Sequence, residues 1–255
     1  LQHVISSSSA FLLEGTLNTS FDGPQLDDIL GLQRHYGDYY EKNGGNDTWS
    51  TATSMGMLGS GQTLSLGTSA ASTVVLPAAK DFVSIDDASD VDFFSFTTTS
   101  AATVNIQLSP VGPTYNVGTP FSSEASYNAS LQSDLTLRLL GTNGTTVLST
   151  ANAGGLGVAE AINSFSVPGA GTYYVKITGA TLNKIQLYRL DITDVTEVAY
   201  SVAGGLLTVT GTSLDDDITV LNDAGAIKVS ANGTLLDPGM AATALTAVSV
   251  SGLGG

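Results

Sequence analysis

Two separate segments of this chain concentrate oxygen-bearing side chains of the kind that hold a metal ion. The first runs Glu41-Lys42-Asn43-Gly44-Gly45-Asn46-Asp47, and the second contains Asp86, Asp87, Asp90 and Asp92. Calcium takes roughly six to eight oxygen ligands, so two such segments brought together would supply a site. The alternative is that the second segment is a solvated turn that precedes a strand.

A catalytic zinc site cannot be formed by this chain alone. The chain contains two histidines, His3 and His35, and neither lies in a His-Glu-x-x-His sequence. A catalytic zinc ion takes about three protein ligands and keeps an open position for water. We therefore predict no catalytic residues. His35 lies near the end of a predicted helix, where positive charge is favourable, and we interpret it as structural.

Residues 24–37 have the sequence pattern of an amphipathic helix. Pro24 suits the first helical position, Asp27 and Asp28 fall in the first turn, and Gly37 supplies the stop. Such a helix must bury its apolar face against another element. We expect that partner to lie upstream of Leu1, which predicts that the chain begins inside a truncated domain.

From about residue 47 to residue 193, apolar residues alternate with polar ones. Residues 104–108, 135–139 and 173–177 follow this period of two, and turn sequences such as Asn143-Gly144 separate the segments. Short strands at this spacing predict an antiparallel β-sandwich with a jelly-roll-like arrangement.

The pattern restarts beyond residue 195. Short alternating phrases at 206–210, 218–220 and 248–250 are separated by Gly-rich or Asp-rich turns. Repeats of this kind are typical of a β-roll or solenoid. We predict a short, truncated segment of that type over residues 195–255.

Composition restricts the classes of partner. The net charge is −15, from 23 acidic and 8 basic residues, which argues against nucleic acid and anionic membranes. There is no cysteine, no apolar run long enough to span a membrane, and no signal peptide or initiator Met at the start. A secreted bacterial protein stabilised by means other than disulfides fits these features. We expect it to be a monomer.

Two phrases near the N-terminus resemble matrixin-type zinc metalloproteases of the metzincin group. Gly23 to Gly37 resembles the last helix of their catalytic domain, and Leu1-Gln2-His3 resembles the Leu-x-His that closes their zinc signature. The resemblance implies that His3 is the third zinc ligand, whereas a terminal histidine without a role is the alternative. Leu13 stands where the family has its Met-turn methionine.

Three further phrases resemble the bacterial pre-peptidase C-terminal domain. They are Glu41 to Thr53, Asp90 to Phe96, and Pro168 to Val175. Related collagen-binding modules bind Ca²⁺ between the two acidic segments. The resemblance therefore implies calcium ligands, with the last three named as additional candidates: Asn46, Asp47, Asp92, the Phe93 carbonyl, Glu41, Asp87 and Asp90.

These observations predict a mainly β protein in three parts. Residues 1–40 would be the remnant of a metalloprotease catalytic domain, 41–194 a pre-peptidase C-terminal-like sandwich, and 195–255 the repeat segment. The function expected is the C-terminal part of a secreted zinc metalloendopeptidase, inactive by itself. Its sandwich would aid secretion or the binding of an extracellular protein or polysaccharide substrate.

A non-enzymatic reading is the alternative. In it the chain is a calcium-stabilised extracellular binding or adhesion module that attaches a secreted protein to a matrix or polysaccharide. Several tyrosines could then form an aromatic binding face. These are Tyr115, Tyr127, Tyr173, Tyr174 and Tyr188.

Overall fold

The structure is a computed structural model with one α-helix and eighteen strands among its described residues. The described residues are 26–41, 45–59, 61–71, 75–76, 78–117, 123, 125–179, 184–196, 198–211, 216–231 and 234–251. Most of the chain is strand, as the alternating pattern predicts. Within these ranges there is no helix that is both long and apolar enough to cross a membrane.

Ten of the strands between residues 53 and 194 form the predicted β-sandwich. One five-stranded sheet has the order β1 (Thr53–Met57), β4 (Val91–Thr98), β11 (Gly171–Gly179), β8 (Leu135–Leu140) and β9 (Val147–Ala151). The other has the order β10 (Glu160–Val167), β5 (Ala102–Pro110), β12 (Gln186–Asp194) and β2 (Thr63–Leu66), and β3 (Val83–Ile85) also pairs with β12. Neighbouring strands are antiparallel except β1 and β4, which are parallel.

The core of the sandwich lies between these sheets. On β5, β8 and β11 the alternate apolar side chains point inward, so Val104, Ile106 and Leu108 of β5 are buried and the residues between them are not. Phe94 and Phe96 of β4 meet them from the other sheet in one continuous cluster. The period of two in the sequence is therefore the inside–outside alternation of the two sheets.

Helix α1 (Leu26–Tyr36) packs on the sandwich. Leu26 and Leu30 are buried in a second apolar cluster that includes Phe82 and Leu187. The amide Nε2 of Gln33 donates a hydrogen bond to the Phe82 carbonyl at 3.1 Å. The prediction that the apolar face needs a partner upstream is therefore wrong for these residues, because the sandwich covers them. The division of the chain at residue 40 stays a prediction.

A small hairpin contributes to this second cluster. The described residues also include two short 3-10 helices. The hairpin consists of β6 (Thr114–Val117) and β7 (Ala125–Asn128), and its Tyr115 is buried in the same cluster as α1. The short helices are η1 (Trp49–Thr51) and η2 (Ala242–Ala244).

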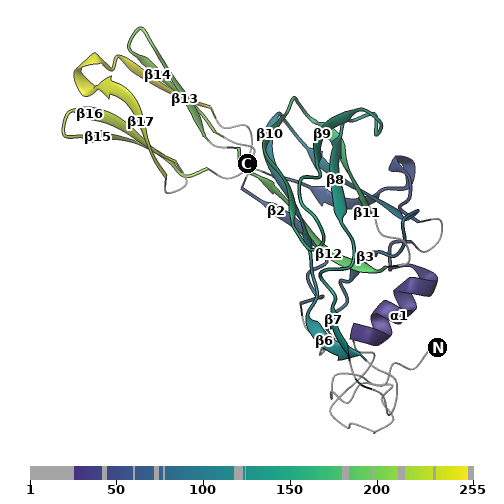
Figure 1. Cartoon of the computed structure of the whole chain (residues 1–255). Coiled ribbons are helices and arrows are strands. Elements are labelled where there is room, and N and C mark those ends of the chain that lie inside the picture. Colours follow the sequence, from purple (N-terminus) through teal and green to yellow (C-terminus); the bar gives the residue numbers. More distant parts are fainter. Residues whose placement is uncertain are drawn as a thin grey trace.

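The C-terminal strands form two small sheets that project from the sandwich (Figure 1). One has the order β13 (Ala199–Ala203), β14 (Leu206–Thr210) and β18 (Ala247–Ser251). The other has the order β15 (Ile218–Asp223), β16 (Ala226–Ala231) and β17 (Thr234–Ala241). The two sheets share one apolar core, which is separate from that of the sandwich.

The predicted β-roll is corrected by this pairing. A β-roll stacks parallel strands of successive coils, whereas most pairs here are antiparallel neighbours along the chain. A period of two cannot distinguish the two arrangements, because both place alternate residues inside. One parallel pair, β14 with β18, is the part of the predicted pattern that the structure contains.

Candidate metal centre

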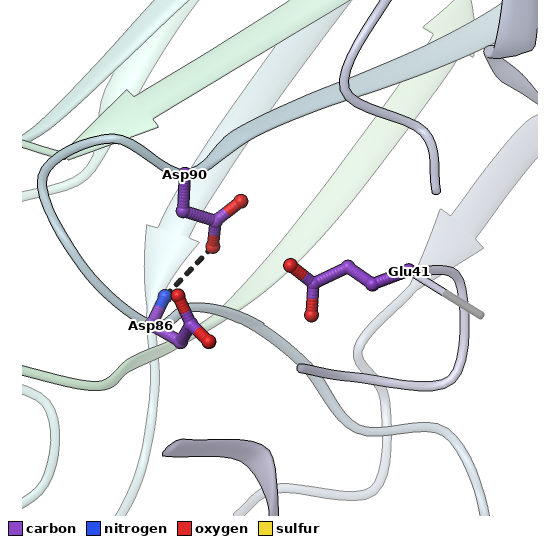
Figure 2. A group of neighbouring side chains, drawn as sticks. All are labelled: Glu41, Asp86 and Asp90. Atoms are coloured by element: carbon purple, nitrogen blue, oxygen red, sulfur yellow. Dashed lines mark hydrogen bonds between the residues drawn. The ribbon is translucent and has the colours of Figure 1, made fainter. Parts of the chain in front are cut away.

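Three carboxylates from two segments converge at one end of the sandwich. Glu41 lies in the turn that follows α1, and Asp86 and Asp90 begin and end the loop between β3 and β4. One oxygen from each lies within 4.8 Å of the others. Figure 2 shows Glu41 reaching toward the two aspartates across the gap between the segments.

Local hydrogen bonds fix the shape of the loop that carries two of these groups. The main-chain N–H of Asp86 donates to Oδ2 of Asp90 at 2.7 Å, which closes the loop on itself (Figure 2). Asp90 is buried, whereas Asp86 and Glu41 are half-buried. The three carboxylates are therefore partly shielded from solvent.

Asp38 holds the turn that carries Glu41. Its Oδ1 accepts a hydrogen bond from the Tyr40 N–H at 2.6 Å, and its Oδ2 accepts one from the Ser84 N–H at 3.2 Å. The Asp38 N–H in turn donates to the Glu41 carboxylate. Gly37 adopts a left-handed φ of 67°, which ends α1 and lets the chain enter this turn. The helix and the carboxylate are thus linked to β3.

Asn46 and Asp92 form a second pair of residues, and both are buried. Nδ2 of Asn46 donates to Oδ1 of Asp92 at 2.8 Å, and the Tyr188 hydroxyl donates to Oδ2 of Asp92 at 2.5 Å. The Phe93 N–H donates to the Asn46 carbonyl at 2.8 Å. These bonds attach the segment around Asn46 to β4 and connect both sheets through Tyr188.

Two of the candidate ligands have a buried oxygen atom without a hydrogen-bond partner among the described residues. These atoms are Oδ1 of Asn46, whose side chain is fully buried, and Oδ1 of Asp90, whose side chain is 8% exposed. A buried acceptor without a partner costs about 1–3 kcal/mol of folding free energy. A cation that contacts either oxygen would remove the cost of that oxygen, and oxygen donors of this kind fit a hard metal ion.

The electrostatics point the same way. Burial, followed by the charge of Asp90, raises the pKa of Glu41 to about 8. Burial, followed by repulsion from Asp86 and Asp38, raises the pKa of Asp90 to about 7. Burial also raises the pKa of Asp92. No basic side chain of the described residues is among the causes of these shifts, so no cationic side chain offsets the cost of the charged forms.

The structure separates the sequence-predicted ligands into groups. Glu41 and Asp90 belong to the convergent cluster, whereas Asn46 and Asp92 form a separate buried pair joined by a hydrogen bond. Asp47 is exposed, and its charge contributes to raising the pKa of Asp90. The N–H of Phe93 is used in the bond to Asn46. His3 lies outside the described residues.

Asp87 has a different role from the one predicted. Its Oδ1 accepts hydrogen bonds from the N–H and hydroxyl of Ser89, both at 2.6 Å, and from the Asp90 N–H at 3.1 Å. These bonds, led by that from the Ser89 hydroxyl, lower the pKa of Asp87. The side chain is half-buried and shapes the loop, and it is absent from the convergent cluster.

Asp86 is a candidate ligand that the sequence analysis did not single out. The sequence places it in the second acidic segment with Asp87, Asp90 and Asp92, and the structure shows that it supplies one of the three convergent carboxylates. Its spacing of four residues from Asp90 was the available signal, because a closed loop of that length brings its two ends together.

The proposed aromatic face is not present. Tyr115, Tyr173 and Tyr188 are buried, at 7%, 3% and 0% exposed, and so they serve the two cores. Tyr127 and Tyr174 are half-buried. Alternate residues of a strand face the core, so tyrosines at these positions point inward and do not form an exposed face.

Comparison with known families identifies the central part of the sandwich. The profile described as "Bacterial pre-peptidase C-terminal domain" matches residues 90–179, which run from the start of β4 to the end of β11. The chain therefore contains a bacterial pre-peptidase C-terminal domain.

Among solved structures, the chain is similar to the pre-peptidase C-terminal domain of a collagenase from Bacillus anthracis. The two are 15% identical, and the alignment covers 56% of this chain and 94% of that one, with a TM-score of 0.33. No curated protein matches the chain.

Proposed function

We propose that this chain is a calcium-stabilised accessory part of a secreted bacterial protease. The observation that carries the calcium site is the convergence of Glu41, Asp86 and Asp90, whose oxygens lie within 4.8 Å of one another, and Oδ1 of Asp90 has no hydrogen-bond partner among the described residues. The association with a protease is supported by the pre-peptidase C-terminal domain at residues 90–179.

Calcium suits this donor set better than zinc or a transition metal. All the converging atoms are oxygens, and zinc and copper sites in proteins favour histidine or cysteine ligands. In the proposed site, Glu41, Asp86 and Asp90 bind the ion directly. Oδ1 of Asn46 and the Asp47 carboxylate are the further oxygens that the sequence offers nearby.

The bound ion would supply positive charge and a cross-link. Glu41 follows α1, whereas Asp86 and Asp90 belong to the loop before β4, so one ion joins two distant segments. It would also neutralise carboxylates that otherwise repel one another. The expected result is a more stable sandwich with α1 held firmly in place.

Calcium titration of Asp90→Asn tests this site. The amide can still accept the Asp86 N–H bond, so the loop is retained while a ligand charge is lost. We expect calorimetric calcium binding to weaken at least about tenfold. The calcium-free variant should be at least as stable as the calcium-free parent, because like-charge repulsion is relieved.

Asp87→Asn is the matched control. It removes the same charge from the same loop, and its Oδ1 can keep the bonds to Ser89. We expect its calcium affinity to stay within about threefold of the parent, since Asp87 lies outside the cluster. Equal losses in both variants, or no calcium binding by the parent up to millimolar concentrations, would refute the site.

The finer proposal is that the protease is a matrixin-like zinc metalloendopeptidase, with His3 as its third zinc ligand. The phrase from Pro24 to Gly37 supports it. In the family this phrase forms a helix, and here α1 spans Leu26–Tyr36 and ends at Gly37. This chain lacks the other zinc ligands, so we expect no zinc-dependent cleavage of casein. Cleavage by the purified chain, abolished by His3→Ala, would contradict this expectation of inactivity.

A further inference from the structure

The C-terminal region contains a short internal repeat. Residues 207–211 read Leu-Thr-Val-Thr-Gly, and residues 248–252 read Val-Ser-Val-Ser-Gly, a shift of 41 positions from Leu207 to Val248. Each phrase alternates an apolar residue with a small hydroxyl residue and ends on glycine. The two phrases supply strands β14 and β18.

These two strands lie side by side with the repeat in register. Leu207 pairs with Val248 and Val209 with Val250, in a parallel arrangement. The Gly211 N–H donates to the Ser251 carbonyl at 2.8 Å, which extends the pairing to the end of the repeat. Equivalent positions of successive repeats therefore stack directly on each other.

Only the first of the two strands is covered. Leu207 and Val209 of β14 are fully buried, whereas their partners Val248 and Val250 on β18 are 42% and 53% exposed. Paired residues in a sheet share a face, so these valines point to the core side. β18 is also the last strand in the order of its sheet, so its outer edge has no strand beside it among the described residues.

The edge of β18 also lacks the features that usually prevent strand pairing. Residues 247–251 include no charge, proline or glycine. By contrast, the edge strand β17 contains Asp237-Pro238-Gly239, and Asp237 forms an ion pair with Lys228. Charges, prolines and irregularities on an edge strand oppose further pairing, and their absence favours it.

We propose that the outer edge of β18 is the acceptor site for a further copy of this repeat. The occupant would be a strand with the pattern apolar-Ser/Thr-apolar-Ser/Thr-Gly, bound parallel and in register, as β18 binds β14. This continues an interface already present in the chain. A second whole molecule is the less favourable occupant, because each carries a net charge of −15 and the two would repel.

The test is a full-length chain in which residues 253–255 are replaced by a second copy of residues 212–252. Amide hydrogen exchange is followed at residues 248–251, with β17 as the internal reference. We expect at least about tenfold slower exchange in β18 of the extended chain and no change in β17. Unchanged exchange in β18 would overturn the proposal.

Two substitutions in the extended chain sharpen the result. Val250→Lys places a charge on the core side and should abolish the added protection, whereas Ser249→Lys, on the other face, should retain it. Loss of protection in both variants to the same extent would contradict register-specific docking. Protection of β18 in the unextended chain that rises with concentration would assign the edge to a second molecule instead, and would also overturn the proposal.

Discussion

The sandwich and the C-terminal pair of sheets differ in how completely they bury their apolar side chains. In the sandwich, two sheets close around a core whose largest side chains, such as Phe94 and Tyr188, are fully buried. In the C-terminal pair, the core is small, and valines on the edge strand β18 remain half exposed. The sandwich has a closed core and buried carboxyl groups, whereas the C-terminal pair keeps an open strand edge.

That difference relates stability to function. Burying carboxylates without basic partners is costly, and only a large apolar core offsets such a cost. The sandwich has that core and gathers Glu41, Asp86 and Asp90 at its end. The C-terminal pair of sheets has a smaller apolar core, and exposed apolar side chains of this region lie on the edge strand β18. One region is therefore suited to hold an ion and the other to hold a strand.

The largest expected effect comes from opening the sandwich core. Phe94→Ala should lower the free energy of unfolding by about 3–5 kcal/mol, because the fully buried ring leaves a cavity between the sheets. Denaturant unfolding measures this loss. Val147→Ala, at a site that is 52% exposed in β9, is the control and should cost less than about 1 kcal/mol. Similar costs for both would contradict the assignment of the core.

Calcium should stabilise one region and not the other. At a calcium concentration of about 100 times Kd, binding adds about 2.7 kcal/mol to the stability of the part that holds the ion. Hydrogen exchange should slow in β3, β4 and the loop at 86–90, and stay unchanged in β13 to β18. Slowing of exchange in the C-terminal strands alone would place the ion elsewhere.

The docking of α1 should depend on pH through Asp27. Burial, followed by the charge of Asp28, raises the pKa of Asp27 from 3.8 to about 6. Because the folded pKa is raised, the cost of the charged form is absent at pH 3.5 and fully present above pH 6. Asp27→Asn should therefore stabilise the protein at pH 8 by about 1 kcal/mol, allowing for solvent screening, and leave it unchanged at pH 3.5.

Thermal melts at the two pH values measure this difference. Asp28→Asn is the control, since it removes a charge from the adjacent position of the same helical turn and should stabilise less. A larger gain at pH 3.5 than at pH 8 would contradict the sign derived for Asp27.

The smallest effect is expected at the open edge. Val250→Ala should change the free energy of unfolding by less than about 0.5 kcal/mol, because the side chain is 53% exposed. The buried Val209→Ala on the neighbouring strand should cost about 1–3 kcal/mol. Equal costs would show that β18 is already covered and would remove the contrast between the two regions.

The sequence predicts the strands of this protein better than their partners. Alternation at 104–108, 135–139 and 173–177 corresponds to β5, β8 and β11, because period two reports burial on one face of a strand. It carries no information on which strands pair or in which direction. The sequence pattern therefore could not predict the antiparallel pairing of the C-terminal hairpins or the parallel pairing of β14 with β18.

Contacts between segments far apart in the sequence could not be predicted either. Leu26 and Leu30 gave α1 an apolar face, but nothing local indicated that Phe82 and Leu187 would cover it. The same limit applies to the metal centre. Acidic segments were evident, yet the choice of Asp86 over Asp87 depends on how the loop before β4 folds back on itself. That folding is a tertiary property.

The most direct test of the calcium site is a crystal structure of the chain grown with calcium. Anomalous difference density should show one ion bound by oxygens of Glu41, Asp86 and Asp90 at about 2.3–2.6 Å, with Asp87 still bonded to Ser89. Absence of an ion between these three carboxylates at millimolar calcium, or an ion held instead by Asp87, would contradict the account.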